Sequence, residues 1–106
     1  MTDYNVLSQE EQDEIIVSFM QAQERDDFCH QLNLSRYETM LKTLPEGDWK
    51  SRVAKLRAET VQRLAEVRSI IAATEPQLPS AERLAVAKNR LLVKNAGKVL
   101  SSEDST

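Results

Sequence analysis

Cys29 and His30 are the only cysteine and the only histidine in the 106-residue chain, and they are adjacent. A thiolate and an imidazole can act together as nucleophile and base, or as two ligands of a zinc ion. Neighbouring residues of a helix point about 100° apart, and no further cysteine or histidine is present to complete a site. We therefore expect no zinc site and no catalytic thiol, with Cys29 a small buried residue and His30 a solvated one.

Paired carboxylates are a second candidate for chemistry, because two neighbouring acids can divide the roles of general acid and general base. Asp26 and Asp27 form such a pair, but capping explains them at the expected start of a helix. The chain contains no glycine-rich phosphate loop. We expect a protein that is not an enzyme, with no cofactor, no bound metal and no small-molecule substrate.

Composition and capping residues predict the helices on which these residues lie. The chain has only two glycines and three prolines, and its β-branched residues do not alternate with polar ones as in a strand. Ser8 with Glu11 forms a capping box at the start of a first helix, and Ser35 with Glu38 forms another. The polar residues 21–27 supply almost no apolar anchor, so the first helix either breaks near Glu24 or runs on exposed, and we expect the break.

Proline and glycine separate the later helices. Pro45 and Gly47 form a turn before Asp48, which can cap a long helix, and residues 75–79 interrupt the chain again before Ser80 caps the last helix. The expected fold is all-α, a small bundle of four to five helices at about residues 8–23, 26–32, 35–44, 48–74 and 80–96.

Residues 26–44 indicate two short helices joined by a tight turn. Cys29, Asn33 and Leu34 match the small residue, the turn residue and the following hydrophobic residue of the helix-turn-helix motif, which this hairpin resembles. The resemblance implies a second helix that reads DNA. The outer face of that helix would carry the candidate DNA-reading residues Arg36, Thr39, Lys42 and Thr43.

Charge is divided between the two halves of the chain. Residues 1–48 carry eleven acidic and three basic residues, a formal charge of −8, whereas residues 49–106 carry eleven basic and six acidic ones, a charge of +5. Such asymmetry indicates nucleic acid, an anionic surface, or packing of one half on the other, within the chain or across a dimer. At 100° per residue the last helix gathers a basic stripe, our candidate interaction surface, of Arg83, Arg90, Lys94 and Lys98.

At 106 residues and 12.1 kDa, the chain suits one helical domain. We expect that domain over residues 1–100 and a disordered polar tail over residues 101–106. An acidic N-terminus, and the lack of an apolar run approaching about 18 residues, predict a cytoplasmic protein without a membrane segment.

We interpret the chain as a non-catalytic helical protein-interaction module: an adaptor, an assembly factor or an inhibitor of a partner protein. A protein partner or self-association is the expected ligand. One alternative is a helix-turn-helix DNA-binding transcriptional regulator, against which the charge of −8 in the front half stands, because DNA binding draws on local positive charge. The other is an acidic-surface mimic that binds a nucleic-acid-binding protein.

Replacing Cys29 and His30 by alanine tests the non-catalytic interpretation. The double variant is expected to stay helical and to bind its partner within about twofold of the native affinity, because neither side chain is expected to perform chemistry. Circular dichroism and partner capture from the native host measure the two properties. A variant that remains folded but has lost binding would contradict the interpretation.

Overall fold

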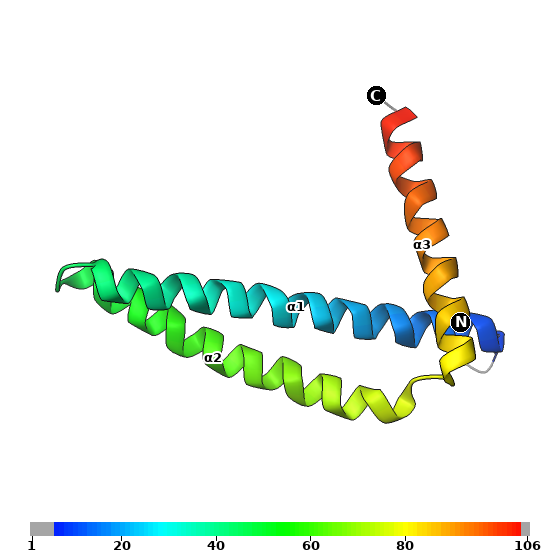
Figure 1. Ribbon diagram of the computed structural model, residues 1–106, viewed down its shortest axis with the longest axis horizontal. Coiled ribbons are helices and arrows are strands. Elements are labelled where there is room, and N and C mark those ends of the chain that lie inside the picture. The colour runs from blue at the N-terminus through cyan, green and yellow to red at the C-terminus, as the bar shows by residue number, and fades with distance from the viewer. Residues whose placement is uncertain (1–5, 105–106) are drawn as a thin grey trace. The chain divides into compact units, whose positions relative to one another are not determined.

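A computed structural model describes the backbone of residues 6–104 and the side chains of residues 6–97. These residues form three α-helices, α1 (Gln9–Thr43), α2 (Asp48–Thr74) and α3 (Ala81–Asp104), with a short 3-10 helix, η2 (Glu75–Gln77), before α3 (Figure 1). No strand occurs within residues 6–104. The all-α class is confirmed, whereas the predicted number of four to five helices is wrong.

The start of α1 is the predicted capping box. The Ser8 hydroxyl accepts a hydrogen bond from the Glu11 backbone N–H at 3.1 Å, and the Glu11 carboxylate accepts one from the Ser8 N–H at 3.4 Å. Glu10 and Glu11 also lie in the first turn, where the positive end of the helix dipole favours acids. Local sequence alone is enough to begin this helix.

The predicted helices at 8–23, 26–32 and 35–44 are a single continuous helix, α1, so the break expected within residues 21–27 is wrong. Residues 9–43 contain neither glycine nor proline, and the run QAQER at residues 21–25 consists of good helix formers. A helix needs an apolar anchor only on the face it buries, so a polar run does not end it.

The helix-turn-helix-like hairpin at residues 26–44 is also wrong, because those residues contain no turn before the end of α1. No non-glycine residue in the described part of the chain has a positive φ, so Asn33 does not adopt the left-handed conformation. The second capping box does not form, since Ser35 lies inside the helix and its carbonyl accepts the Thr39 hydroxyl at 3.0 Å. Asp27, expected near a helix start, instead pairs with Arg68 of α2.

The bounds of α2 agree with the prediction for residues 48–74. Leu44 closes the last turn of α1 by donating to the Met40 carbonyl at 2.8 Å. Gly47 then takes φ = 149°, which a side chain would strain, and its carbonyl accepts the first hydrogen bond of α2, from Ser51 at 3.1 Å. Gly47, rather than Asp48, therefore occupies the N-cap position.

The last helix begins where predicted and continues further. The Ser80 carbonyl accepts the Leu84 N–H at 2.7 Å, which places Ser80 at the N-cap of α3. The backbone stays helical to Asp104, past the predicted end at residue 96, because Gly97 inside a helix costs only about 1 kcal/mol relative to alanine. Residues 101–104 of the predicted disordered tail are helical, and residues 105–106 lie outside the described part of the chain.

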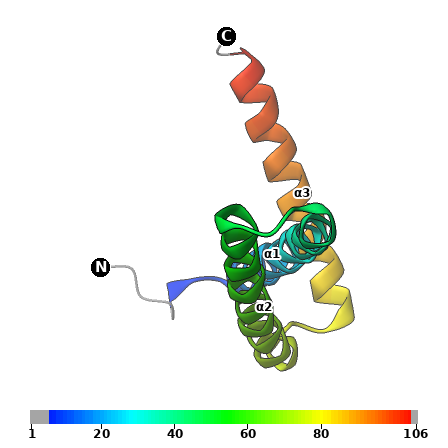
Figure 2. The ribbon, with the colours of Figure 1, turned by 90° about the vertical axis from the view of Figure 1, so that its left-hand side faces the viewer.

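The chain divides into two compact units, and the boundary lies within α1. The first unit comprises Met1–Gln21 and Thr74–Thr106, in which α3 crosses the N-terminal part of α1. The second comprises Ala22–Ala73, in which the rest of α1 and α2 run side by side in opposite directions (Figure 1, Figure 2). The single domain over residues 1–100 stays a prediction.

Little apolar surface is buried among the described residues. The six buried apolar residues are Val17, Met20 and Ala87 in the first unit and Val53, Leu64 and Val67 in the second. A larger number of big apolar side chains is exposed. They are Val6, Ile15, Phe19, Phe28, Leu32, Trp49, Leu56, Val61, Ile70, Val86, Leu92 and Val93.

Two valines of α2 form a matched pair that tests this core. Val53 is 1% exposed and Val61 is 43% exposed. Val53→Ala should lower the free energy of unfolding by about 2 kcal/mol, because it removes buried methyl groups and leaves a cavity. Val61→Ala should change it by less than about 0.5 kcal/mol. Urea denaturation of both variants measures the difference, and equal effects would show that the core is elsewhere.

Candidate functional site

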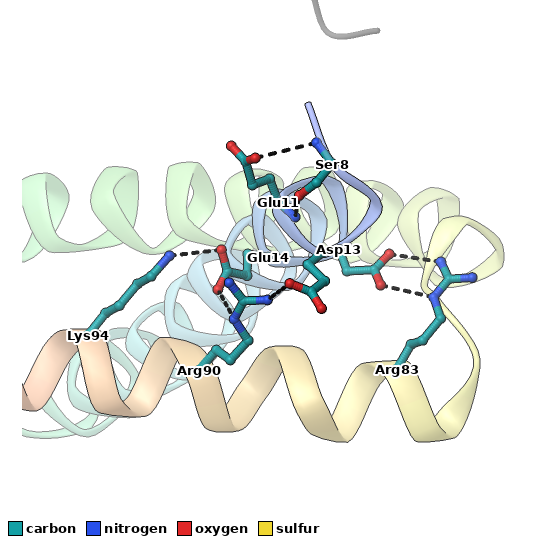
Figure 3. A network of polar contacts seen from close by, with 8 residues as sticks. Ser8, Glu11, Asp13, Glu14, Arg83, Arg90 and Lys94 are labelled. Carbon is teal, nitrogen blue, oxygen red and sulfur yellow. Dashed lines mark hydrogen bonds and ion pairs between the residues drawn. The ribbon is translucent and has the colours of Figure 1, made fainter. Parts of the chain in front are cut away.

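The basic stripe of α3 faces the acidic start of α1 (Figure 3). Arg83, Arg90 and Lys94 are separated by seven and four residues, which places them on one side of the helix. Ala87, which lies between Arg83 and Arg90 in the sequence, has a small side chain that is buried. The side chain of Lys98, the fourth residue predicted for this stripe, lies outside the described residues.

Asp13 is held by two partners. The Arg83 guanidinium donates through Nε at 2.9 Å and through Nη2 at 2.8 Å, a bidentate pair, and Gln9 donates to the same carboxylate at 2.9 Å. The hydrogen bond from Arg83 lowers the pKa of Asp13 below its ordinary value, although burial works in the opposite direction. The same hydrogen bond raises the pKa of Arg83. Both side chains therefore stay charged at neutral pH.

Glu14 is buried beside Asp13 and faces two cations. The Lys94 ammonium donates to Oε2 at 2.9 Å, and Arg90 Nε lies 3.1 Å from Oε1 as an ion pair without the geometry of a hydrogen bond. Arg90 also donates to Glu10, and that bond raises the pKa of Arg90. Arg90 thus bridges two acids one helical turn apart on α1.

This network fits a structural role better than a catalytic one. A general acid or base working near neutral pH needs a pKa near that range, whereas the pKa of Asp13 is moved further away from it. Arginine and lysine paired with carboxylates provide no nucleophile. What the arrangement does is neutralise two buried carboxylates, which offsets much of the desolvation penalty that an unpaired buried charge imposes.

A cavity of about 290 Å³ lies over the same contact. Its lining combines the paired acids and arginines with two small apolar side chains, and is made by Glu10, Asp13, Glu82, Arg83, Val86, Ala87 and Arg90. The guanidinium groups that line it already hold carboxylates of α1. An anionic ligand would have to displace those acids, so the cavity belongs to the helix contact.

The second unit carries two further ion pairs between helices. Arg68 donates to Asp27 at 3.0 Å, and Arg57 donates to Glu38 at 3.4 Å. The bond from Arg68 lowers the pKa of Asp27. In both units, then, acids of the front half meet bases of the back half. Packing of one half on the other was among the explanations of the charge asymmetry, and these contacts realise it within the chain.

The four candidate DNA-reading residues lie on the exposed surface of α1, in its C-terminal part. The hydroxyls of Thr39 and Thr43 bond to backbone carbonyls of the same helix. Arg36 and Lys42 are exposed, and the helix they lie on is not set off by a turn. The structure therefore brings these residues to one helix but not to a separate reading helix.

Cys29 and His30 are placed differently from the expectation. Cys29 is exposed and His30 is half-buried, the reverse of what the sequence predicts. Residues 6–97 contain no group of three or more histidine, cysteine, aspartate or glutamate side chains able to hold a metal ion.

None of the helices in the part of the chain described is long and apolar enough to span a membrane. No protein-family model, curated protein or solved structure matches the chain.

The lowered pKa of Asp13 predicts how the first unit responds to acid. A carboxyl whose pKa is lower in the folded state stabilises that state above its ordinary pKa of 3.8, and the contribution disappears as pH falls through the lowered value. Asp13→Asn should therefore lower the free energy of unfolding at neutral pH. The difference from the native chain should shrink as the pH falls below about 4.

The control for this variant is Asp26→Asn, which removes an exposed acid of the same helix that forms no ion pair within residues 6–97. Urea denaturation followed at neutral pH and near pH 3 measures all three chains. A difference between Asp13→Asn and the native chain that grows on acidification would contradict the assigned direction of the shift.

Proposed function

We propose that this chain is a non-catalytic helical protein-interaction module that offers helix faces to a protein partner. The observation that carries the proposal is the number of large apolar side chains exposed in both units, against only six buried apolar residues among those described. Apolar surface in contact with water is unfavourable by about 25 cal/mol per Å², so a second protein that covers it is favoured.

Exposed apolar side chains of α3 support the proposal in the first unit. Val86, Leu92 and Val93 are each more than half exposed. At 100° per residue Leu92 lies about 160° around the helix from Arg90 and from Lys94, whose side chains point to α1, whereas Val86 and Val93 lie about 40° and 60° from Arg90, at the edge of that contact. The contact with α1 is thus charged, and apolar side chains are left exposed both on the far side of α3, at Leu92, and at the edge of the contact, at Val86 and Val93. A partner with an apolar surface would bury these side chains on binding.

The two other functions considered have less support. A DNA reader would have relied on the hairpin at residues 26–44, and α1 is continuous there. The basic residues Arg83, Arg90 and Lys94 are paired with acids, so gripping phosphate would break these pairs. An acidic mimic would use the acids at the start of α1, of which Asp13 and Glu14 are buried and Glu10 is paired with Arg90, which leaves Glu11 exposed.

The double variant Leu92→Gln and Val93→Gln tests the proposal. It should weaken partner binding at least about tenfold while leaving the circular dichroism spectrum unchanged, because both side chains are exposed in the unbound chain. Lys88→Gln, an exposed polar position of the same helix, is the matched control. Capture of binding proteins from the native host, followed by titration of the recovered partner, measures the effect. Unchanged affinity of the double variant would remove α3 from the proposal.

A further inference from the structure

The hairpin of the second unit has two unlike edges. Measured around α2 from the buried Val53, Arg57 and Arg68 lie about 40° to 60° to one side, and their ion pairs with α1 close that edge. Trp49 and Leu56 lie about 40° to 60° to the other side, and they are 57% and 42% exposed. The first edge is therefore bridged by two ion pairs and has Val61 exposed beside them, and the second presents Trp49 and Leu56 to solvent without an ion pair between the helices on that side among the described residues.

The core of this hairpin is also incomplete. Every buried apolar residue of the second unit belongs to α2, and no residue of α1 between 22 and 43 is buried. The apolar residues of this part of α1 are at most half-buried, Tyr37, Met40 and Leu41 among them. Two helices cannot enclose each other's apolar faces, and a second pair of helices packed on them completes such a core.

The exposed edge of α2 has a seven-residue repeat. Trp49, Leu56, Arg63 and Ile70 follow one another at this spacing, and the stripe drifts about 20° per repeat, as it does along the seam of a left-handed supercoil. The stripe extends over about 32 Å of helix, which is three heptads. We name these four residues the α2 stripe. Its length suits pairing with another long helix.

Charges beside the α2 stripe select the partner and its direction. The neighbouring row, also spaced by seven, reads Arg52, Glu59 and Glu66, so its charge changes from positive to negative along the helix. None of the three forms an ion pair within residues 6–97. A copy of the same helix in the opposite direction would meet positive with negative at both ends.

We propose that the α2 stripe is the interface of an antiparallel homodimer, whose two-fold axis passes near residues 59 and 60. Trp49 then lies opposite Ile70 of the second copy, and Leu56 lies against the aliphatic stem of the second copy's Arg63. Arg52 falls within one residue of Glu66 of the second copy. In a parallel pair these rows of the two copies would lie on opposite sides of the seam, so Arg52 would not meet Glu66. The inference rests on the proposed function, and it names a second copy as the occupant of this face.

Two polar substitutions on α2 test the face. Leu56→Gln should raise the dimer dissociation constant at least about tenfold, because each dimer loses two apolar contacts. Val61→Gln is the matched control, since Val61 has nearly the same exposure, 43% against 42%, on the opposite side of α2. Analytical ultracentrifugation over a concentration series measures the dissociation constants. A native chain that stays monomeric, or equal effects of the two variants, would overturn the proposal.

A charge exchange tests the antiparallel register and does not depend on the apolar substitution. Arg52→Glu and Glu66→Arg should each weaken the dimer about threefold to tenfold at low salt, because each turns two attractions into repulsions. Combining them should restore the native dissociation constant, since the opposite charges meet again. Failure of the double variant to recover would overturn the antiparallel pairing.

The outcomes separate this inference from the proposed function. A monomeric native chain that captures a different protein, and loses it on Leu56→Gln but not on Val61→Gln, would overturn the homodimer and leave the interaction module standing. A chain that neither dimerises nor captures any protein would overturn both.

Discussion

Two neighbouring carboxylates, those of Asp13 and Glu14, are buried on α1, and the first unit depends on how they are neutralised. A charge removed from water destabilises a fold unless an opposite charge and hydrogen bonds replace the solvent. Arg83 and Lys94 supply both, each at 2.8 to 2.9 Å from its acid. Few apolar side chains are buried in this unit, so the ion pairs fix which side of α3 meets α1 and which side stays in solvent.

Helix bounds were predictable where proline or glycine restricts the backbone. Pro45 and Gly47 before α2, and Pro76 after it, restrict the backbone whatever the surroundings, and the predicted bounds of that helix are correct. The break within α1 rested on side-chain polarity and on capping signals, which do not restrict the backbone. Ser8 caps a helix because neither Leu7 nor Ser8 is itself helical, whereas Ser35 follows residues that are already helical. The same capping pattern therefore gives opposite outcomes.

The site was half predictable for a similar reason. Helical spacing alone places Arg83, Arg90 and Lys94 on one face, because the period of a helix is set by its backbone. The acids that meet them are some 70 to 80 residues away in the sequence, and no local pattern states which of the acids in the front half will be buried. The charge asymmetry between the halves was the available signal. This asymmetry indicated that cations of the back half pair with acids of the front half, but it did not indicate which acid pairs with which cation.

Both units turn charge inward at a helix contact and leave apolar side chains in solvent. In the first unit the paired acids lie against α3 while Leu92 and Val93 are exposed, and in the second Arg57 and Arg68 close one edge while Trp49 is exposed. Ion pairs hold helices in register at little net gain in stability, whereas apolar surface adds free energy when it is covered. In such a chain the specific ion pairs lie at the helix contacts, and apolar surface that would add stability on burial is exposed to solvent. Association with another protein would cover this apolar surface and gain that free energy.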